Sequence, residues 1–329
     1  MSRTACLVFN PVAGQGDSER DLEVIKSYLE PEFELEILFT TREVGGGELA
    51  CRAVENGAKV IIASGGDGTV SAVAEALIET DIILGAIARG TANAFANALS
   101  IPDTIEAACE TILAGATKKV DAAICNGKPM ILLVGIGFEA ETVENADREA
   151  KDRLGILAYV LSGLKQLQEF ARFTATIETE DKVITVKASA ITVANAAPPS
   201  SVLAHGTAGV IYDDGLLDIT ILAPQTKTGA IATSIQLLQS AGNEEAVERE
   251  GVGYLRSKWV KVTTDPPQKV VVDGEVVRQT PVEVRCIPNS LTVFAPEEAN
   301  VQREKLDNLP GVDIRRVQLI LGIEKKNSI

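Results

Sequence analysis

A glycine-rich stretch between an apolar run and a helix pattern is the feature that most constrains the fold of this chain. Residues 64–69 read Ser-Gly-Gly-Asp-Gly-Thr, after the apolar run 59–63 and before the helix-patterned segment 70–78. Glycines at such a junction let backbone N–H groups approach a bulky anion, because no Cβ stands in the way. A tight turn without a ligand needs fewer glycines than this. The stretch therefore predicts a phosphate-binding loop.

Asp67 is the one acidic residue inside this loop. Its carboxylate would repel a bare phosphate, whereas a divalent cation between the two groups would attract both. The expected arrangement is therefore a magnesium ion between Asp67 and a phosphate.

The first 125 residues alternate short apolar runs with helix-patterned segments. Besides the run before the glycine loop, strands are expected at 5–9, 35–39, 82–87 and 120–125, and helices at 17–29, 49–54, 91–99 and 105–113. Apolar strands separated by helices indicate a parallel sheet covered on both faces, and ligands bind outside the carboxyl ends of such strands. Four loops follow strand ends and are expected to meet: they carry Asn10, Thr40, 65–69 and 90–91.

From about residue 130 the pattern changes to strands with long irregular links. Alternation at 260–262 and 282–286 favours antiparallel strands with one wet face, so a β-rich second domain is expected. We place 1–125 and about 295–329 in the first domain and 126–294 in the second. The expected strands are 130–134, 172–178, 183–193, 217–222, 259–264, 269–273, 281–286 and 291–294, with helices at 155–170, 228–240 and 297–306.

Composition excludes several classes of function. Five scattered cysteines without a C-x-x-C pair indicate reduced thiols rather than disulfides or a zinc site. A formal net charge of −15 argues against a nucleic-acid partner, because such binding depends on neutralising phosphates. The chain has one histidine, His205, so a general base is expected to be a carboxylate.

The sequence also bears on where the protein works. No apolar run reaches the roughly 18 residues that a membrane span needs, and the N-terminus passes into a strand pattern without the features of a signal peptide. A cytoplasmic protein without a transmembrane segment is expected. The sequence leaves open whether the protein is a monomer or a homodimer.

Five motifs together resemble one family. They occur in the order found in the soluble bacterial diacylglycerol kinase-like lipid kinases, whose catalytic domain is similar to that of sphingosine kinases, and the resemblance covers about residues 4–296. It implies a phosphofructokinase-like α/β N-terminal domain that binds ATP, a β-sandwich C-terminal domain, and an active site between them. The motifs are Asn10-Pro11 with Gly14, Gly65 to Thr69, Gly90 to Asn93 with Phe95, Tyr212 to Asp218, and Val272 to Glu275.

The resemblance also implies roles for individual residues. Asp67 would organise Mg²⁺, and Glu275 would be the general base. A second, structural magnesium would be bound by the Asp214 side chain and the carbonyls of Ile211 and Leu216. From the residues alone, 273–274 and 213–215 are strong turn signals as well. The implied nucleotide-binding set is Asn10, Thr40, Gly66, Asp67, Gly68, Thr69, Val70, Ser71 and Thr91.

Three residues depart from the family pattern, and the first is Gln15, which stands where some members have a basic residue. Ala94 stands where the family usually has an aspartate that joins the network around Asp67. Arg89 stands where an apolar residue is more usual, and two destinations are open for its side chain: a phosphate, or a carboxylate such as Asp67.

The leading hypothesis is an ATP- and magnesium-dependent kinase that phosphorylates the hydroxyl of diacylglycerol or a related lipid, working peripherally at a membrane surface. The helix 155–170 and the loop around His205 are expected to line the lipid's approach. A second hypothesis is a nucleotide- or lipid-binding regulatory protein with weakened catalysis, motivated by Ala94. An NAD kinase is disfavoured, because 90–93 differ from the stretch that resembles those enzymes.

Overall fold

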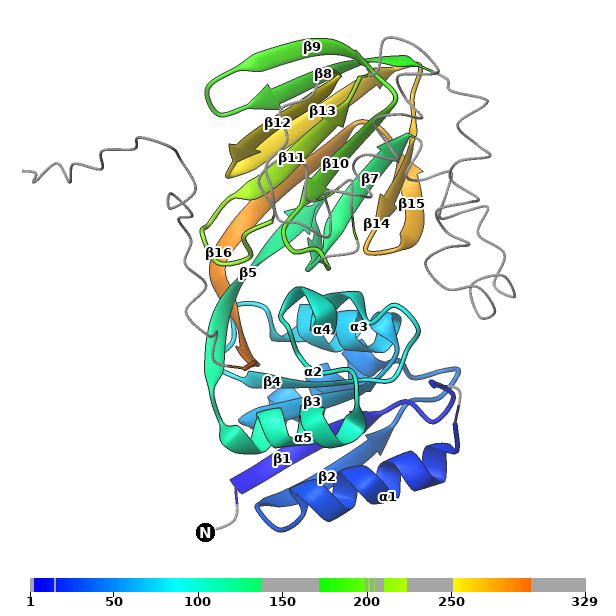
Figure 1. Cartoon of the computed structure of the whole chain (residues 1–329), viewed down its shortest axis with the longest axis vertical. Helices are drawn as coiled ribbons and strands as arrows, with labels where there is room; N and C mark the ends of the chain where they lie inside the picture. Colours follow the sequence, from blue (N-terminus) through cyan, green and yellow to red (C-terminus); the bar gives the residue numbers. More distant parts are fainter. Residues whose placement is uncertain are drawn as a thin grey trace, which may run out of the picture. The chain divides into compact units, whose positions relative to one another are not determined.

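The computed structural model describes residues 3–14, 16–137, 172–198, 201, 204, 210–223 and 251–296 (Figure 1). Residues 1–296 form one compact unit. The expected helices at 155–170, 228–240 and 297–306, His205, and the assignment of the tail to the first domain lie outside the described residues. Among the helices that are described, none combines the length and apolarity needed to cross a membrane.

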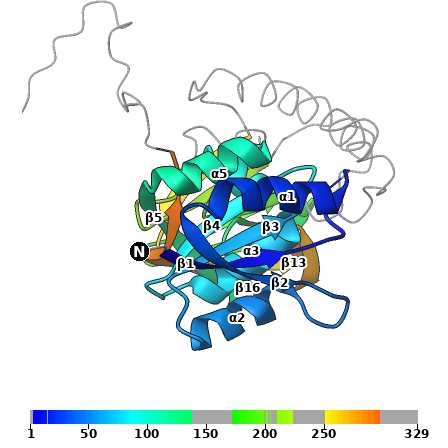
Figure 2. The ribbon, with the colours of Figure 1, turned by 90° about the horizontal axis from the view of Figure 1, so that it is seen from below.

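The first part of the chain is a parallel sheet with helices on both faces. Strands run in the order β2-β1-β3-β4, and all three pairings are parallel. In Figure 2, α1 and α5 lie on one side of these strands and α2 on the other. The strands are β1 (Arg3–Phe9), β2 (Phe33–Phe39), β3 (Val60–Gly65) and β4 (Ile83–Ala88); the helices are α1 (Ser18–Leu29), α2 (Gly46–Glu55), α3 (Asp67–Leu77), α4 (Ala94–Ala98) and α5 (Ile105–Ala114).

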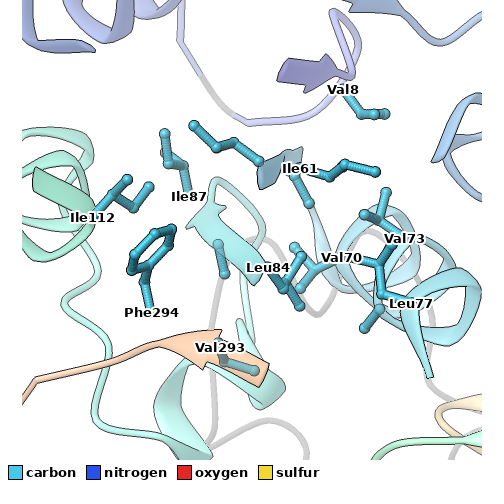
Figure 3. Close-up of a cluster of buried hydrophobic side chains, with 14 of the residues drawn as sticks. Val8, Ile61, Val70, Val73, Leu77, Leu84, Ile87, Ile112, Val293 and Phe294 are labelled. Atoms are coloured by element: carbon cyan, nitrogen blue, oxygen red, sulfur yellow. The ribbon is translucent and has the colours of Figure 1, made fainter. Parts of the chain in front are cut away.

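Apolar residues at helical spacing fix α3 against this sheet. Val70, Val73 and Leu77 are buried and lie on one side of β4, while Ile112 of α5 and Phe294 lie on the other (Figure 3). Because α3 begins at Asp67, within the glycine loop and not at residue 70 as expected, this packing holds the loop at the end of β3.

The second sheet is wholly antiparallel. Its order is β12-β11-β10-β7-β14-β15, which confirms the expected change of architecture. Its strands are β7 (Leu133–Gly137), β10 (Ala190–Ala194), β11 (Leu217–Leu222), β12 (Val252–Ser257), β14 (Lys269–Val272) and β15 (Glu275–Gln279).

One long strand, β16 (Val282–Phe294), joins the α/β part to the β-rich part. It pairs in parallel with β4 and antiparallel with β5 and β13, so the first sheet extends to ten strands. Ile177, Val262 and Val284 of this extension share one buried core with residues of the second sheet, as a β-sandwich requires. The remaining strands are β5 (Thr117–Cys125), β6 (Lys128–Met130), β8 (Phe173–Thr179), β9 (Val183–Ala188) and β13 (Trp259–Asp265).

The structure corrects four expectations. The helix expected at 91–99 begins at Ala94, because Asn93 adopts a left-handed conformation with φ of 48°. The strand at 120–125 pairs antiparallel with β16 instead of joining the parallel set. The strand at 183–193 is two strands in different sheets, and those at 281–286 and 291–294 are one strand with an irregular register. β6, β12 and β15 were not predicted.

Candidate active site

The glycine loop is built by close backbone approach. A Cβ on Gly65 would lie 2.7 Å from the Thr69 side chain, and one on Gly90 would lie 2.9 Å from the Cα of Gly66. The loops after β3 and β4 therefore touch backbone to backbone, and fold geometry alone explains these glycines. Gly68 is exposed with open space around its Cα, and a Cβ on Gly66 would make only an ordinary contact of 3.7 Å, so packing requires a glycine at neither position.

The loop after β1 is tied to the start of α3. The Asn10 amide donates to Thr69 Oγ1 at 2.9 Å, and its carbonyl oxygen accepts from the Val12 N–H. These contacts bring Asn10 and Thr69 close to the place where Gly66 meets Gly90. The sequence predicted that the loops after these strand ends would meet. The N–H of Thr40 bonds to the Phe9 carbonyl, which places Thr40 beside the end of β1.

Three other predicted nucleotide-binding residues differ in exposure. Thr91 is exposed, whereas Val70 and Ser71 are buried in the first turns of α3. The Val70 N–H already donates to the Gly66 carbonyl at 3.1 Å. Nucleotide contact by all three stays a prediction.

Asp67 links the glycine loop to α4. Its two carboxylate oxygens accept the backbone N–H groups of Asn93, at 3.1 Å, and of Ala94. An anion at the N-terminus of a helix satisfies amides that lack helical partners. Each oxygen keeps a further lone pair, and the side chain is half-buried, so Asp67 fits a divalent cation.

Arg89 binds a carboxylate, as one of the two expected destinations required, but that carboxylate is not Asp67. Its carboxylate partner is Asp21 of α1, at 2.8 Å from Nη1, and its guanidinium is buried. Sequence reasoning missed this pair because Asp21 stands 68 positions away.

Glu275 lies at the start of β15, after a two-residue turn. Asp273 and Gly274 both have positive φ, of 47° and 87°, and Val272 pairs with Glu275 across the turn. This is the hairpin that Asp-Gly predicts. Glu275 is exposed, as a group that meets a substrate must be.

Asp273 anchors this hairpin. Its carboxylate accepts the backbone N–H groups of Ile131, Leu132 and Leu133 at 2.8–3.0 Å. Burial raises the pKa of Asp273 to about 6, and the charge of Glu275 adds to the rise, although the three N–H groups favour the ionised form. Asp273 therefore holds the hairpin that carries Glu275. In the sequence Asp273 looks like a turn residue only, so this role was not predicted.

Glu75 on α3 connects the two halves of the candidate site. Burial, followed by the charges of Asp273 and Glu275, raises the pKa of Glu75 to about 7, while Lys128 opposes the rise. The geometric link is that α3 contacts β6, the strand of Lys128, which ends just before the residues 131–133 that bind Asp273. In the sequence, Glu75 looks like any glutamate on the exposed face of a helix, so sequence reasoning did not single it out.

Replacing Glu75 with Gln is expected to stabilise the protein at pH 8 and to leave it unchanged at pH 4. A glutamate in an unfolded chain titrates near about 4.3. The raised pKa makes the folded state hold the proton more tightly, so native stability falls as pH rises from there to about 7. Since Glu75 is half-buried, water limits the gain to about 1 kcal/mol. Urea unfolding at both pH values measures it.

Glu55→Gln, at an exposed position on α2, is the matched control and should show no such difference. A Glu75→Gln protein that loses stability at pH 8 would contradict the assignment.

The turn 211–216, before β11, carries the predicted structural metal ligands. Asp214 Oδ1 accepts the Leu216 N–H at 3.1 Å, and Oδ2 pairs with Arg256 at 3.1 Å. Arg256 also binds Asp218, which is fully buried. The described residues hold no cluster of three or more His, Cys, Asp or Glu placed for a metal. The predicted site needs one carboxylate and two carbonyls, so it stays a prediction.

The buried carboxylate of Asp121 is hydrogen-bonded to the turn 211–216. It accepts the N–H groups of Gly215 at 2.6 Å and of Asn289, in β16, at 2.7 Å. Burial raises the pKa of Asp121 despite these bonds. Sequence reasoning missed Asp121, which looks like one polar residue in an apolar strand.

Comparison with known proteins agrees with this architecture. Residues 4–125 match the diacylglycerol kinase catalytic domain, and residues 133–295 match the YegS C-terminal NAD kinase beta sandwich-like domain. Fold and site together define a phosphotransferase with an alcohol acceptor. The chain belongs to the diacylglycerol kinase-like lipid kinase family.

Three relatives illustrate the match. An uncharacterized protein of Synechocystis is 51% identical over 308 residues, which are 90% of this chain and 71% of that protein. The diacylglycerol kinase of Bacillus subtilis is 28% identical, over 93% of this chain and all of its own. The crystal structure of a diacylglycerol kinase from Bacillus anthracis has a TM-score of 0.73 and 28% identity, covering 90% of this chain and 97% of that one.

Proposed function

We propose that this lipid kinase transfers the γ-phosphate of ATP to the hydroxyl of diacylglycerol or a related lipid. The observation that carries the proposal is that α3, which starts in the glycine loop with Asp67, contacts β6. This strand ends just before the residues 131–133 whose N–H groups anchor the Glu275 hairpin through Asp273. Phosphoryl transfer needs a phosphate-binding loop and a positioned base in one site.

The nucleotide phosphates would lie against Gly66, Gly68 and the backbone at the start of α3, with Asn10, Thr40 and Thr91 beside them. Gly66 caps α3 without a side chain, so no side-chain acceptor covers the N–H groups at this helix start. Thr69, Val70 and Ser71 complete the set. Asp67 would hold Mg²⁺, which neutralises charge on the phosphates when bound.

Glu275 would take the proton of the lipid hydroxyl. The freed oxygen then bonds to the γ-phosphorus while the bond from that phosphorus to the β-phosphate oxygen breaks, and ADP leaves. Asp273 keeps the hairpin in place during this step through its three backbone bonds. In this proposal 1–125, with about 295–329, bind nucleotide and 126–294 bind the lipid at a membrane surface.

Phosphorylation of diacylglycerol in mixed micelles with labelled ATP tests the proposal. Labelled phosphatidic acid is the expected product of the native chain with Mg²⁺. Diacylglycerol is the first acceptor to try, and a labelled lipid extract identifies another acceptor if it is preferred. ATP binding without transfer to any lipid hydroxyl would contradict the proposal.

One observation favours a second candidate, a regulatory protein with weakened catalysis. The Ala94 N–H binds Asp67, but its side chain offers no carboxylate, so position 94 adds no second negative charge beside Asp67. Under this alternative the native chain binds nucleotide without transfer, and Ala94→Asp restores turnover. Under the lipid kinase proposal the native chain turns over, and the variant changes the rate by less than about tenfold.

The predicted structural magnesium has its own test. Each carboxylate oxygen of Asp214 has one partner, the Leu216 N–H or the Arg256 guanidinium, and keeps a further lone pair. Asp214 can therefore bind a metal ion while it stays paired with Arg256. We expect Mg²⁺ to raise the melting temperature of the native chain by a few degrees, since ligands that bind only the folded state stabilise it. Asp214→Asn should abolish that increment and Asp213→Asn should keep it. An equal increment in all three proteins would contradict a metal at this turn.

A further inference from the structure

Arg89, directly after β4, is a buried cation surrounded by the loop that follows β1. Its side chain is 3% exposed, and Asp21 on α1 is its ionic partner. A buried guanidinium is tolerated only where carboxylate and hydrogen-bond partners compensate its desolvation. Besides Asp21, the hydrogen-bond partners of the Arg89 guanidinium are the hydroxyl of Ser64 and the carbonyls of Asn10 and Ala13, at 2.6–3.1 Å.

An aromatic ring fixes the orientation of the guanidinium. Its central carbon lies 4.2 Å from the centre of the Phe9 ring, within cation–π range. With the ring on one face and hydrogen bonds along its edges, the planar fork has one orientation. Lysine cannot reproduce this, because an ammonium has no planar edge to span several acceptors.

These contacts determine the path of the backbone from Asn10 to Gly14. Arg89 binds the carbonyls at positions 10 and 13, and a Cβ on Gly14 would lie 3.4 Å from the Arg89 carbonyl. The same turn carries the Asn10 amide that binds Thr69 on α3. Arg89 thus fixes both ends of the turn, which lies beside the glycine loop.

We infer that the Arg89–Asp21 pair is a positioning device that holds the turn 10–14 in the conformation that receives the nucleotide triphosphate. The inference rests on the proposed nucleotide site. Arg89 itself does not touch the phosphates, because its edges are occupied by the protein. Its contribution is to order the turn before binding, which raises affinity by removing the entropic cost of ordering.

Asp21→Asn is the main test, because Asp21 is 24% exposed and its loss disturbs the core less than loss of Arg89. We expect the dissociation constant of ATP, from calorimetry without lipid, and the KM for ATP to rise about tenfold, with kcat within about twofold. Amide hydrogen exchange of residues 12–14 in the free protein should speed up. Arg89→Lys should show the same changes and no rescue.

The control removes an exposed arginine–carboxylate pair on the surface, in contrast to the buried guanidinium of Arg89. Arg52→Met breaks the exposed pair with Glu48 on α2 and should leave ATP binding and exchange unchanged. Faster exchange in Asp21→Asn with unchanged ATP affinity, or a fall in kcat at constant KM, would overturn the inference and leave the proposed function standing. A native chain that binds no ATP would overturn both.

Discussion

Glu275→Gln is expected to lower the rate of phosphoryl transfer by about 10²–10⁴-fold while ATP binding stays unchanged. General bases contribute about this much, and Gln keeps the size of the side chain but cannot accept the hydroxyl proton. Glu275 is exposed and lies outside the glycine loop, so its loss leaves the nucleotide contacts intact. Steady-state transfer to diacylglycerol at saturating ATP, with calorimetric ATP binding beside it, measures both quantities.

The matched control is Glu180→Gln, an exposed carboxylate in the turn between β8 and β9. Its turnover should equal that of the native chain. A Glu275→Gln protein with more than about a tenth of native kcat would exclude Glu275 as the base.

Asp67→Asn should have the second largest effect, with turnover lowered by at least about 100-fold and recovered poorly by added Mg²⁺. The carboxylate has two functions: it caps α4 through Asn93 and Ala94, and in our proposal it holds the cation. A lost cap costs about 0.5–2 kcal/mol of stability. The metal function is therefore read from the dependence of kcat on Mg²⁺ concentration, and the cap from the free energy of unfolding.

Asp81→Asn, an exposed residue before β4, should change neither quantity. If Asp67→Asn loses stability but keeps the native dependence on Mg²⁺, Asp67 is a helix cap and the cation is held elsewhere.

The α/β half of the fold was predictable because its signals are local. Apolar runs between helix patterns indicated the parallel sheet, and the ends of β1, β2, β3 and β4 fall within two residues of the predicted ends. The pairing of strands is a different matter. The alternation of polar and apolar residues in a strand shows which face is exposed to water, but it does not show which strand pairs with it. The sequence could not predict that 183–193 divides between two sheets.

Among the candidate site residues, those on motifs could be singled out from the sequence, and most of those that support them could not. Asp67 and Glu275 stand beside glycines that mark turns. Asp273, Glu75 and Arg89 act through partners far away in the chain, such as the amides of 131–133 and the carboxylate of Asp21. Pairing at such distances depends on the tertiary structure, which no local pattern encodes.

The strand β16 has a mechanical consequence. Together with β5 it forms a two-stranded ribbon that continues from the parallel strands into the sandwich, with its pairing interrupted only between Ile287 and Leu291. A hydrogen-bonded ribbon resists stretching and sliding but yields to torsion. The break in this pairing lies where Asn289 has a left-handed backbone and is bound by Asp121, so a bond from β5 itself stiffens the point at which the ribbon could twist.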